Sequence, residues 1–119
     1  MFAFKKTQRL LKKADYDHVF EQAKKLVTSE FIVLYRENNL GYARLGLALS
    51  KKMIAKAHDR NRIKRLLRES FRQNRLPAVD IVFLARQGVA KQTNSGINTK
   101  LSKTWEKLTV AYDKQCAYQ

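Results

Sequence analysis

The chain has 119 residues and a mass of 13.9 kDa, the length of one domain, which we expect to span residues 1–119. Its 25 lysines and arginines exceed its 10 aspartates and glutamates, so the formal net charge is +15 and an acidic partner is expected. Apolar residues make up 45% of the chain, which excludes a disordered polybasic tail and allows one packed core.

The cysteine count and the hydropathy pattern exclude further classes. A single cysteine, Cys116, excludes an intramolecular disulfide and a cysteine-built metal site, which fits a reducing compartment. No segment approaches the ~20 apolar residues that cross a bilayer, and the N-terminus lacks the apolar run of a signal peptide. We therefore expect a cytoplasmic protein with no membrane contact.

The first half of the chain predicts one helix and two strands. Apolar residues at three- and four-residue spacings predict a helix over residues 14–23. Residues 26–36 predict a strand that is apolar on both faces. After a turn at residues 37–41, residues 42–50 predict a second strand, so the two strands are expected to pair as an antiparallel hairpin. Gly46 in the second strand indicates a bulge or a close backbone approach.

The second half predicts a helix, a strand and a closing helix. The helix spans residues 57–75 and ends before Pro77, which cannot continue it. Residues 78–86 predict a third strand, and residues 87–95 a polar linker. The closing helix has an apolar stripe of Ile97, Leu101, Trp105, Leu108 and Tyr112. The order α-β-β-α-β-α predicts a small α+β sandwich, with residues 113–119 as a flexible tail.

The positive charge is concentrated in one block. Residues 51–75 contain ten basic and two acidic residues, a net charge of +8, whereas residues 26–50 are neutral. On a helical wheel, Ile63, Leu67 and Phe71 share one face, and the basic side chains project from the opposite face. Between residues 60 and 75 six arginines accompany one lysine, and the planar guanidinium suits bidentate contact with phosphate. This helix predicts nucleic acid binding.

The run from Lys56 to Arg72, which contains Arg60-Asn61-Arg62, resembles the RNR motif of the protein subunit of bacterial ribonuclease P. The resemblance covers almost the whole chain. It extends to Arg9-Leu10, Lys12-Lys13, Asp15-Tyr16, Val19-Phe20, Leu45-Gly46-Leu47, Ser50-Lys51-Lys52, Asp80-Ile81-Val82 and Ala85-Arg86.

The resemblance implies a subunit of an RNA-based endoribonuclease that removes the 5′ leader from precursor tRNA. The RNA subunit would hold the catalytic Mg²⁺ ions, with no cofactor bound by the protein alone and no obligate protein partner. The implied fold is that of a ribosomal protein S5 domain, with a left-handed βαβ crossover around the RNR helix.

Carried over by position, the resemblance assigns two sets of residues. Those implied to bind the RNA subunit are Arg60, Asn61, Arg62, Lys64, Arg65, Arg68 and Arg72. Those implied to hold the leader, in a cleft between the first helix and the sheet, are Tyr16, Phe20, Val33 and Tyr35. Base stacking on such rings is tolerant of sequence. The alternative is that these four side chains belong to the core, and for Phe20 the two readings stay open.

The sequence offers little for a protein active site. His18 and His58 are the only histidines, Asp59 reads as a helix N-cap, and Asp80 stands alone in an apolar strand. Two other functions stay open. A ribosomal or other structural RNA-binding protein would be equally basic, and a DNA-binding module would place the arginine helix in a major groove, although the preceding helix of a helix-turn-helix is missing.

Overall fold

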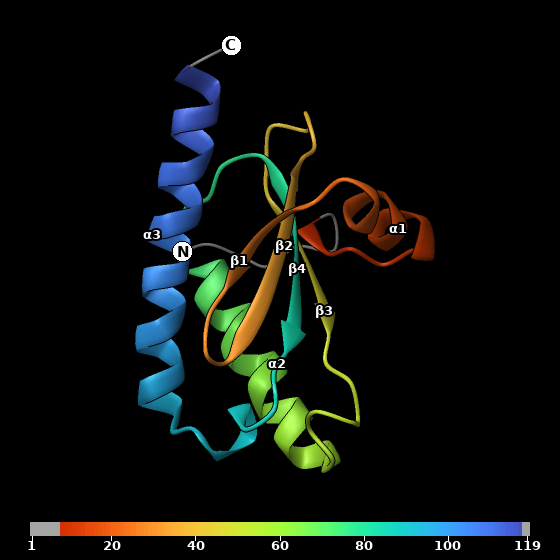
Figure 1. Cartoon of the computed structure of the whole chain (residues 1–119), viewed down its shortest axis with the longest axis vertical. Helices are drawn as coiled ribbons and strands as arrows, with labels where there is room; N and C mark the ends of the chain where they lie inside the picture. Colours follow the sequence, from red (N-terminus) through yellow and green to blue (C-terminus); the bar gives the residue numbers. More distant parts are fainter. Residues whose placement is uncertain (1–7, 118–119) are drawn as a thin grey trace.

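The structure is a computed structural model that describes residues 8–117 of the chain. Its elements follow in the order α1 (Lys13–Glu21), β1 (Lys24–Val27), β2 (Phe31–Glu37), β3 (Arg44–Ala48), α2 (Ala57–Arg72), β4 (Val79–Ala85), a 3₁₀ turn η2 (Val89–Lys91) and α3 (Asn94–Ala117). The strands form one sheet in the order β1-β2-β4-β3. Helix α1 covers one face of this sheet, and α2 and α3 cover the other (Figure 1). The predicted α+β sandwich is confirmed.

The strand expected over residues 26–36 is a hairpin of two strands, β1 and β2, which pair in antiparallel orientation. Thr28 closes the turn between them: its hydroxyl accepts a hydrogen bond from the Phe31 N–H at 2.9 Å, and its own N–H donates to the Phe31 carbonyl at 2.8 Å. The polar segment at the turn is only three residues long and has apolar residues on both sides. The sequence pattern therefore predicted one continuous strand.

The hairpin expected between residues 26–36 and residues 42–50 is wrong, because β2 and β3 are not paired. Strand β4 lies between β2 and β3, antiparallel to β2 and parallel to β3. All of β4 except Leu84 is buried. A strand this apolar is stable only in the centre of the sheet, where both faces are covered. The connection from β3 through α2 to β4 is consequently a parallel crossover, which brings α2 onto the face shared with α3.

Two helix ends differ from expectation. Helix α2 ends at Arg72, three residues early, because Asn74 turns the chain back: its N–H donates to the Phe71 carbonyl at 3.2 Å and its side-chain amide to the Ser70 carbonyl at 2.6 Å. Helix α3 continues to Ala117, so most of the segment expected as a tail has a helical backbone. Residues 118–119 lie outside the described part of the chain.

The sheet separates two apolar clusters of unequal size. The larger lies between the sheet and the helices α2 and α3, where Phe83 contacts Phe31 and Trp105 edge-on at centroid distances of 5.4 Å. The smaller lies under α1 and is built on Leu10, Val19 and Val82. Helix α2 is thus anchored by the main core, whereas α1 rests on a small patch of the opposite face.

Within residues 8–117, no helix combines the length and the apolar character needed to cross a membrane.

Candidate nucleic-acid interface

Helix α2 has the two sides expected from the sequence. Ile63, Leu67 and Phe71 are buried against the sheet, and the Trp105 indole N–H of α3 donates to the Ser70 hydroxyl at 2.7 Å. The side chains on the opposite side make no hydrogen bond or ion pair with any residue that the structure describes; they are Asn61, Lys64, Arg65 and Arg68. We call these four residues the α2 basic face. A fixed helix with unpaired cations is suited to bind a polyanion.

Arg60 and Arg62 do not belong to this face, although the resemblance to the RNR motif implied that they bind RNA together with it. The Arg60 guanidinium donates to the carbonyls of Ile54 and Ala55 at 2.8 and 3.0 Å. The Arg62 guanidinium donates to Asn94 Oδ1 at 2.5 Å and to two carbonyls of the β4–α3 connection. Both side chains therefore bind their own chain.

Arg72 is engaged by a neighbour one turn earlier on α2. Its guanidinium forms an ion pair with Glu69, which also accepts a hydrogen bond from the Gln73 side chain at 3.0 Å. The hydrogen bond from Arg72 holds the pKa of the Glu69 carboxyl below its usual value, and the same bond raises the pKa of Arg72. Arg72 thus already binds a carboxylate of its own helix, unlike the α2 basic face.

On the other face of the sheet, Tyr16 and Phe20 occupy different environments. The Tyr16 ring lies on Gly46, and its hydroxyl accepts a hydrogen bond from the Leu47 N–H at 3.2 Å. The close approach expected at Gly46 is confirmed. Phe20 is 46% exposed, with its ring centroid 6.4 Å from that of Tyr16. Tyr16 therefore attaches α1 to the sheet, and Phe20 presents an aromatic surface to solvent.

The structure places Val33 and Tyr35 on the opposite face of the sheet from α1. Val33 is fully buried and Tyr35 is 6% exposed, and both belong to the core cluster under α2 and α3. Because side chains alternate along a strand, the β2 residues on the α1 face are Ile32, Leu34 and Arg36. The expectation that Val33 and Tyr35 face Tyr16 and Phe20 is wrong by one residue of register.

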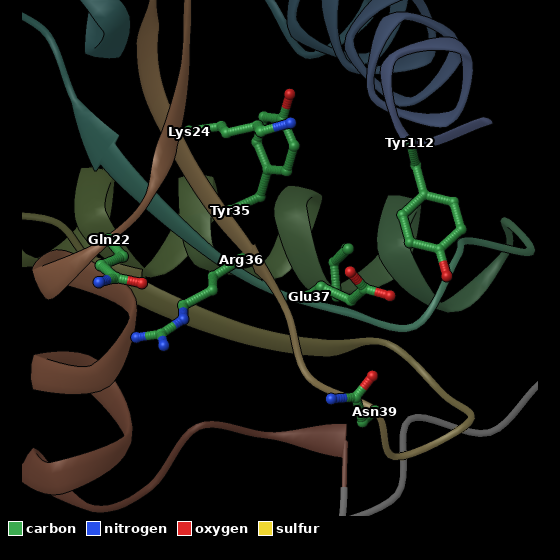
Figure 2. A pocket seen from close by; sticks show the side chains of 8 residues that line it. Gln22, Lys24, Tyr35, Arg36, Glu37, Asn39 and Tyr112 are labelled. Atoms are coloured by element: carbon green, nitrogen blue, oxygen red, sulfur yellow. The ribbon is translucent and has the colours of Figure 1, made fainter. Parts of the chain in front are cut away.

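Tyr35 instead lines a pocket of about 290 Å³ at the end of β2, opposite Tyr112 of α3 (Figure 2). The pocket is also lined by Gln22, Lys24, Arg36, Glu37, Asn39 and Val79. Burial raises the pKa of the Tyr35 hydroxyl. The pocket mixes both charge signs, so it does not extend the α2 basic face.

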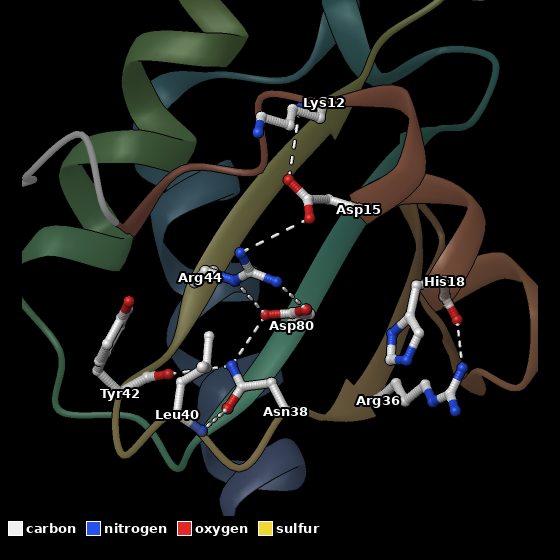
Figure 3. Close-up of polar contacts among 9 residues, drawn as sticks. All are labelled: Lys12, Asp15, His18, Arg36, Asn38, Leu40, Tyr42, Arg44 and Asp80. Atoms are coloured by element: carbon white, nitrogen blue, oxygen red, sulfur yellow. Dashed lines mark hydrogen bonds and ion pairs between the residues drawn. The ribbon is translucent and has the colours of Figure 1, made fainter.

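A buried carboxylate that the sequence pattern left unexplained ties the loop after β2 to the sheet and α1. Asp80 is 1% exposed and accepts two hydrogen bonds from the Arg44 guanidinium, at 2.8 and 2.6 Å. It also accepts a hydrogen bond from the Asn38 amide at 2.8 Å, and Arg44 lies 3.8 Å from Asp15 of α1 (Figure 3). The hydrogen bond to Asp80, with the nearby charges of Asp80 and Asp15, raises the pKa of Arg44. Asp80 thus has a structural role. Its partner Arg44 could be identified only from the pairing of β3 with β4, which places the two residues directly opposite each other.

The described residues hold no group of three or more His, Cys, Asp and Glu side chains that could bind a metal ion. The His58 Nε2 atom lies 3.4 Å from Asp59 Oδ1, and the imidazole is largely exposed. The α2 basic face is a surface that can bind and orient a polyanion.

Comparisons with known proteins identify the family. The family model described as Ribonuclease P matches residues 4–109. The chain is 78% identical over 114 residues to a ribonuclease P protein component of Legionella pneumophila (strain Lens), an alignment that covers 96% of this chain and all of the relative. It is 48% identical to that of Haemophilus influenzae (strain PittGG), with coverage of 87% and 89%. The RNase P protein of Staphylococcus aureus superimposes with a TM-score of 0.78 at 30% identity and covers 86% of this chain and 97% of its own. The chain belongs to the ribonuclease P protein family.

Proposed function

We propose that this chain binds the ribonuclease P RNA subunit through the α2 basic face and holds the 5′ leader of precursor tRNA on the α1 side of the sheet. The RNA subunit, with its Mg²⁺ ions, carries out the cleavage that removes the leader. The protein raises the affinity for the precursor and supplies no catalytic group. Precursor tRNA is made in the bacterial cytoplasm, so the proposed site of action is there.

One observation carries the proposal: Lys64, Arg65 and Arg68 are cations without partners among the described residues, on a helix fixed by the main core. Like charges at three- and four-residue spacings repel one another by a few tenths of a kcal/mol per pair. An RNA phosphate backbone along the helix removes this repulsion and releases counterions. Asn61 adds an amide that can donate to phosphate and accept from a ribose hydroxyl.

The proposed leader surface is a row of apolar side chains that crosses the sheet beside α1. Strand pairing aligns Val27, Ile32, Leu84 and Ala48, one from each strand. Val27 is 55% exposed and the other three are partly buried. Helix α1 covers the neighbouring row, so this one borders the helix that carries Phe20. Apolar and aromatic contacts bind unpaired bases with little sequence preference, as processing of many different leaders requires.

Reconstitution with ribonuclease P RNA at low Mg²⁺ tests the proposal. The measurement is the rate of leader release from precursor tRNA, with and without the protein. The protein should raise this rate, and the double variant Arg65→Ala/Arg68→Ala should require a higher protein concentration for the same rate. A protein that binds the RNA but leaves the rate unchanged would instead be a structural RNA-binding protein, and the proposal would be refuted.

A further inference from the structure

Arg60, Asn61 and Arg62 point in three different directions from the first turns of α2. Residues two apart on an α-helix diverge by about 200°, so the two arginines leave on nearly opposite sides of the helix. Asn61 projects outward between them and is exposed. The triplet therefore combines one outward amide with two lateral guanidinium groups.

Arg62 reaches the connection between β4 and α3. One terminal nitrogen donates to Asn94 Oδ1 at 2.5 Å, and the other donates to the carbonyls of Ala90 and Gln92 at 2.8 and 3.3 Å. These acceptors lie in η2, immediately after it and at the first residue of α3. A guanidinium has five N–H donors in a rigid plane and can hold three acceptors at once, whereas an ammonium is a compact point charge.

Arg60 makes the equivalent contact on the other side. Its guanidinium donates to the carbonyls of Ile54 and Ala55, which precede α2. Ile54 is 1% exposed, so this segment is already packed into the core, and Arg60 fixes its backbone direction. The two arginines thus tie two connections, far apart in sequence, to one end of the same helix.

Both connections carry exposed lysines. Lys56 is the residue before α2, and Lys91 follows Ala90, whose carbonyl Arg62 holds. Neither lysine side chain makes a hydrogen bond or ion pair with any side chain or backbone group that the structure describes. Their charges therefore add to the α2 basic face only if the connections that carry them are held in place.

We propose that Arg60 and Arg62 are positioning residues and that Lys56 and Lys91, which they hold beside α2, contact the RNA subunit. The inference rests on the proposed function and changes which residues contact the RNA subunit. The RNA meets Asn61, Lys64, Arg65 and Arg68 along the helix and one lysine from each flanking connection. Arg60 and Arg62 act on RNA binding through these connections.

The test measures the affinity of the intact protein for ribonuclease P RNA over a salt gradient, with amide hydrogen exchange of residues 86–94 as a second readout. Arg62→Ala should weaken binding about tenfold and speed exchange in this segment. Arg62→Lys keeps the charge but cannot span the three acceptors, so it should show most of the same defect. Asn94→Ala removes a neutral acceptor and should weaken binding about threefold, while the matched control Asn98→Ala, an exposed asparagine on the same helix, should have no effect.

A double-mutant cycle decides how Arg62 acts. If Arg62 acts through the position of Lys91, the Arg62→Ala/Lys91→Ala protein should bind little worse than the poorer single variant. Additive losses, full rescue by Arg62→Lys, or a silent Asn94→Ala would each overturn the inference and make Arg62 a direct phosphate contact. Failure of the proposed function looks different, because Arg65→Ala and Arg68→Ala would then also leave RNA binding unchanged.

Discussion

The Tyr16 ring lies so close to Gly46 that a methyl group on this glycine would be 2.8 Å from Tyr16 Cε1. The ring cannot easily withdraw, because its hydroxyl is held by the Leu47 N–H. We expect Gly46→Ala to lower the free energy of unfolding by about 1–3 kcal/mol, as overpacking commonly does. Denaturant unfolding measures the loss. Adding Tyr16→Leu, which removes the ring that the new methyl group would meet, should recover part of it. A Gly46→Ala loss of the same size in the Tyr16→Leu background would contradict this account.

Phe20 and Val33 should separate leader binding from stability. Phe20 is 46% exposed, so Phe20→Ala should leave the unfolding free energy within about 0.5 kcal/mol of the original. It should weaken the holoenzyme's affinity for precursor tRNA by about 1–3 kcal/mol, because a base-stacking surface is lost, and leave mature tRNA binding unchanged.

Val33→Ala should do the reverse, because Val33 is fully buried under α2 and α3. We expect a loss of about 2 kcal/mol in unfolding free energy and no preferential effect on the precursor. The same two measurements serve as the check. If Val33→Ala weakened binding of the precursor but not of mature tRNA, Val33 would be part of the leader surface after all.

The alternation in β2 could be read from the sequence, but the face that α1 covers could not. Residues 31–35 are all apolar, so neither set of alternating side chains marks the solvent side. Side chains of β2 contribute to both the small cluster under α1 and the main core. Which alternate set faces α1 depends on how the three helices are placed on the sheet. The central position of β4 could not be predicted for a similar reason. Strand order depends on which strand would expose the most apolar surface at an edge of the sheet.

The α2 basic face could be predicted because helical periodicity alone separates Ile63, Leu67 and Phe71 from the cations. The periodicity does not predict the contacts of side chains at the edges of this face, such as Arg60 and Arg62. The groups that these two side chains bind belong to two connections that lie up to 32 residues away along the chain.

Asp80→Ala should destabilise the fold strongly. It would leave the Arg44 guanidinium and the Asn38 amide, both part of a network around a carboxylate that is 1% exposed, without their main acceptor. Breaking a buried ion pair by removing one partner costs about 3–5 kcal/mol. Thermal and denaturant unfolding report the change. The matched control is Asp17→Ala, an exposed aspartate on α1, and the account fails if the two variants are equally stable.

Acidification should open the Glu69–Arg72 pair. Because Arg72 lowers the pKa of Glu69, the pair is present at neutral pH, and the stability it adds is lost only as the pH falls through that lowered pKa. Glu69 is exposed and Arg72 is only partly buried, so the effect on folding is small.

Glu69→Gln removes the carboxylate that pairs with Arg72, so the net positive charge of α2 rises at neutral pH. We expect tighter binding of the RNA subunit and a salt dependence steeper by about one phosphate contact. Titrations at several salt concentrations measure both. The variant Glu106→Gln, an exposed glutamate on α3 with no ion pair to the described residues, is the matched control and should change neither. Weaker binding by Glu69→Gln would show that the ion pair itself supports the interface.

The salt dependence of RNA-subunit binding should identify the direct contacts on α2. The Arg65 and Arg68 side chains are exposed and bind no other residue in the described part of the chain. Each replacement by alanine should weaken binding and lower the slope of log affinity against log salt by about one unit, since one fewer counterion is released. Lys103→Ala removes an exposed cation from the outward side of α3 and should leave the slope unchanged. A wild-type slope in both arginine variants, or an equal fall for Lys103→Ala, would place the RNA subunit elsewhere on the protein.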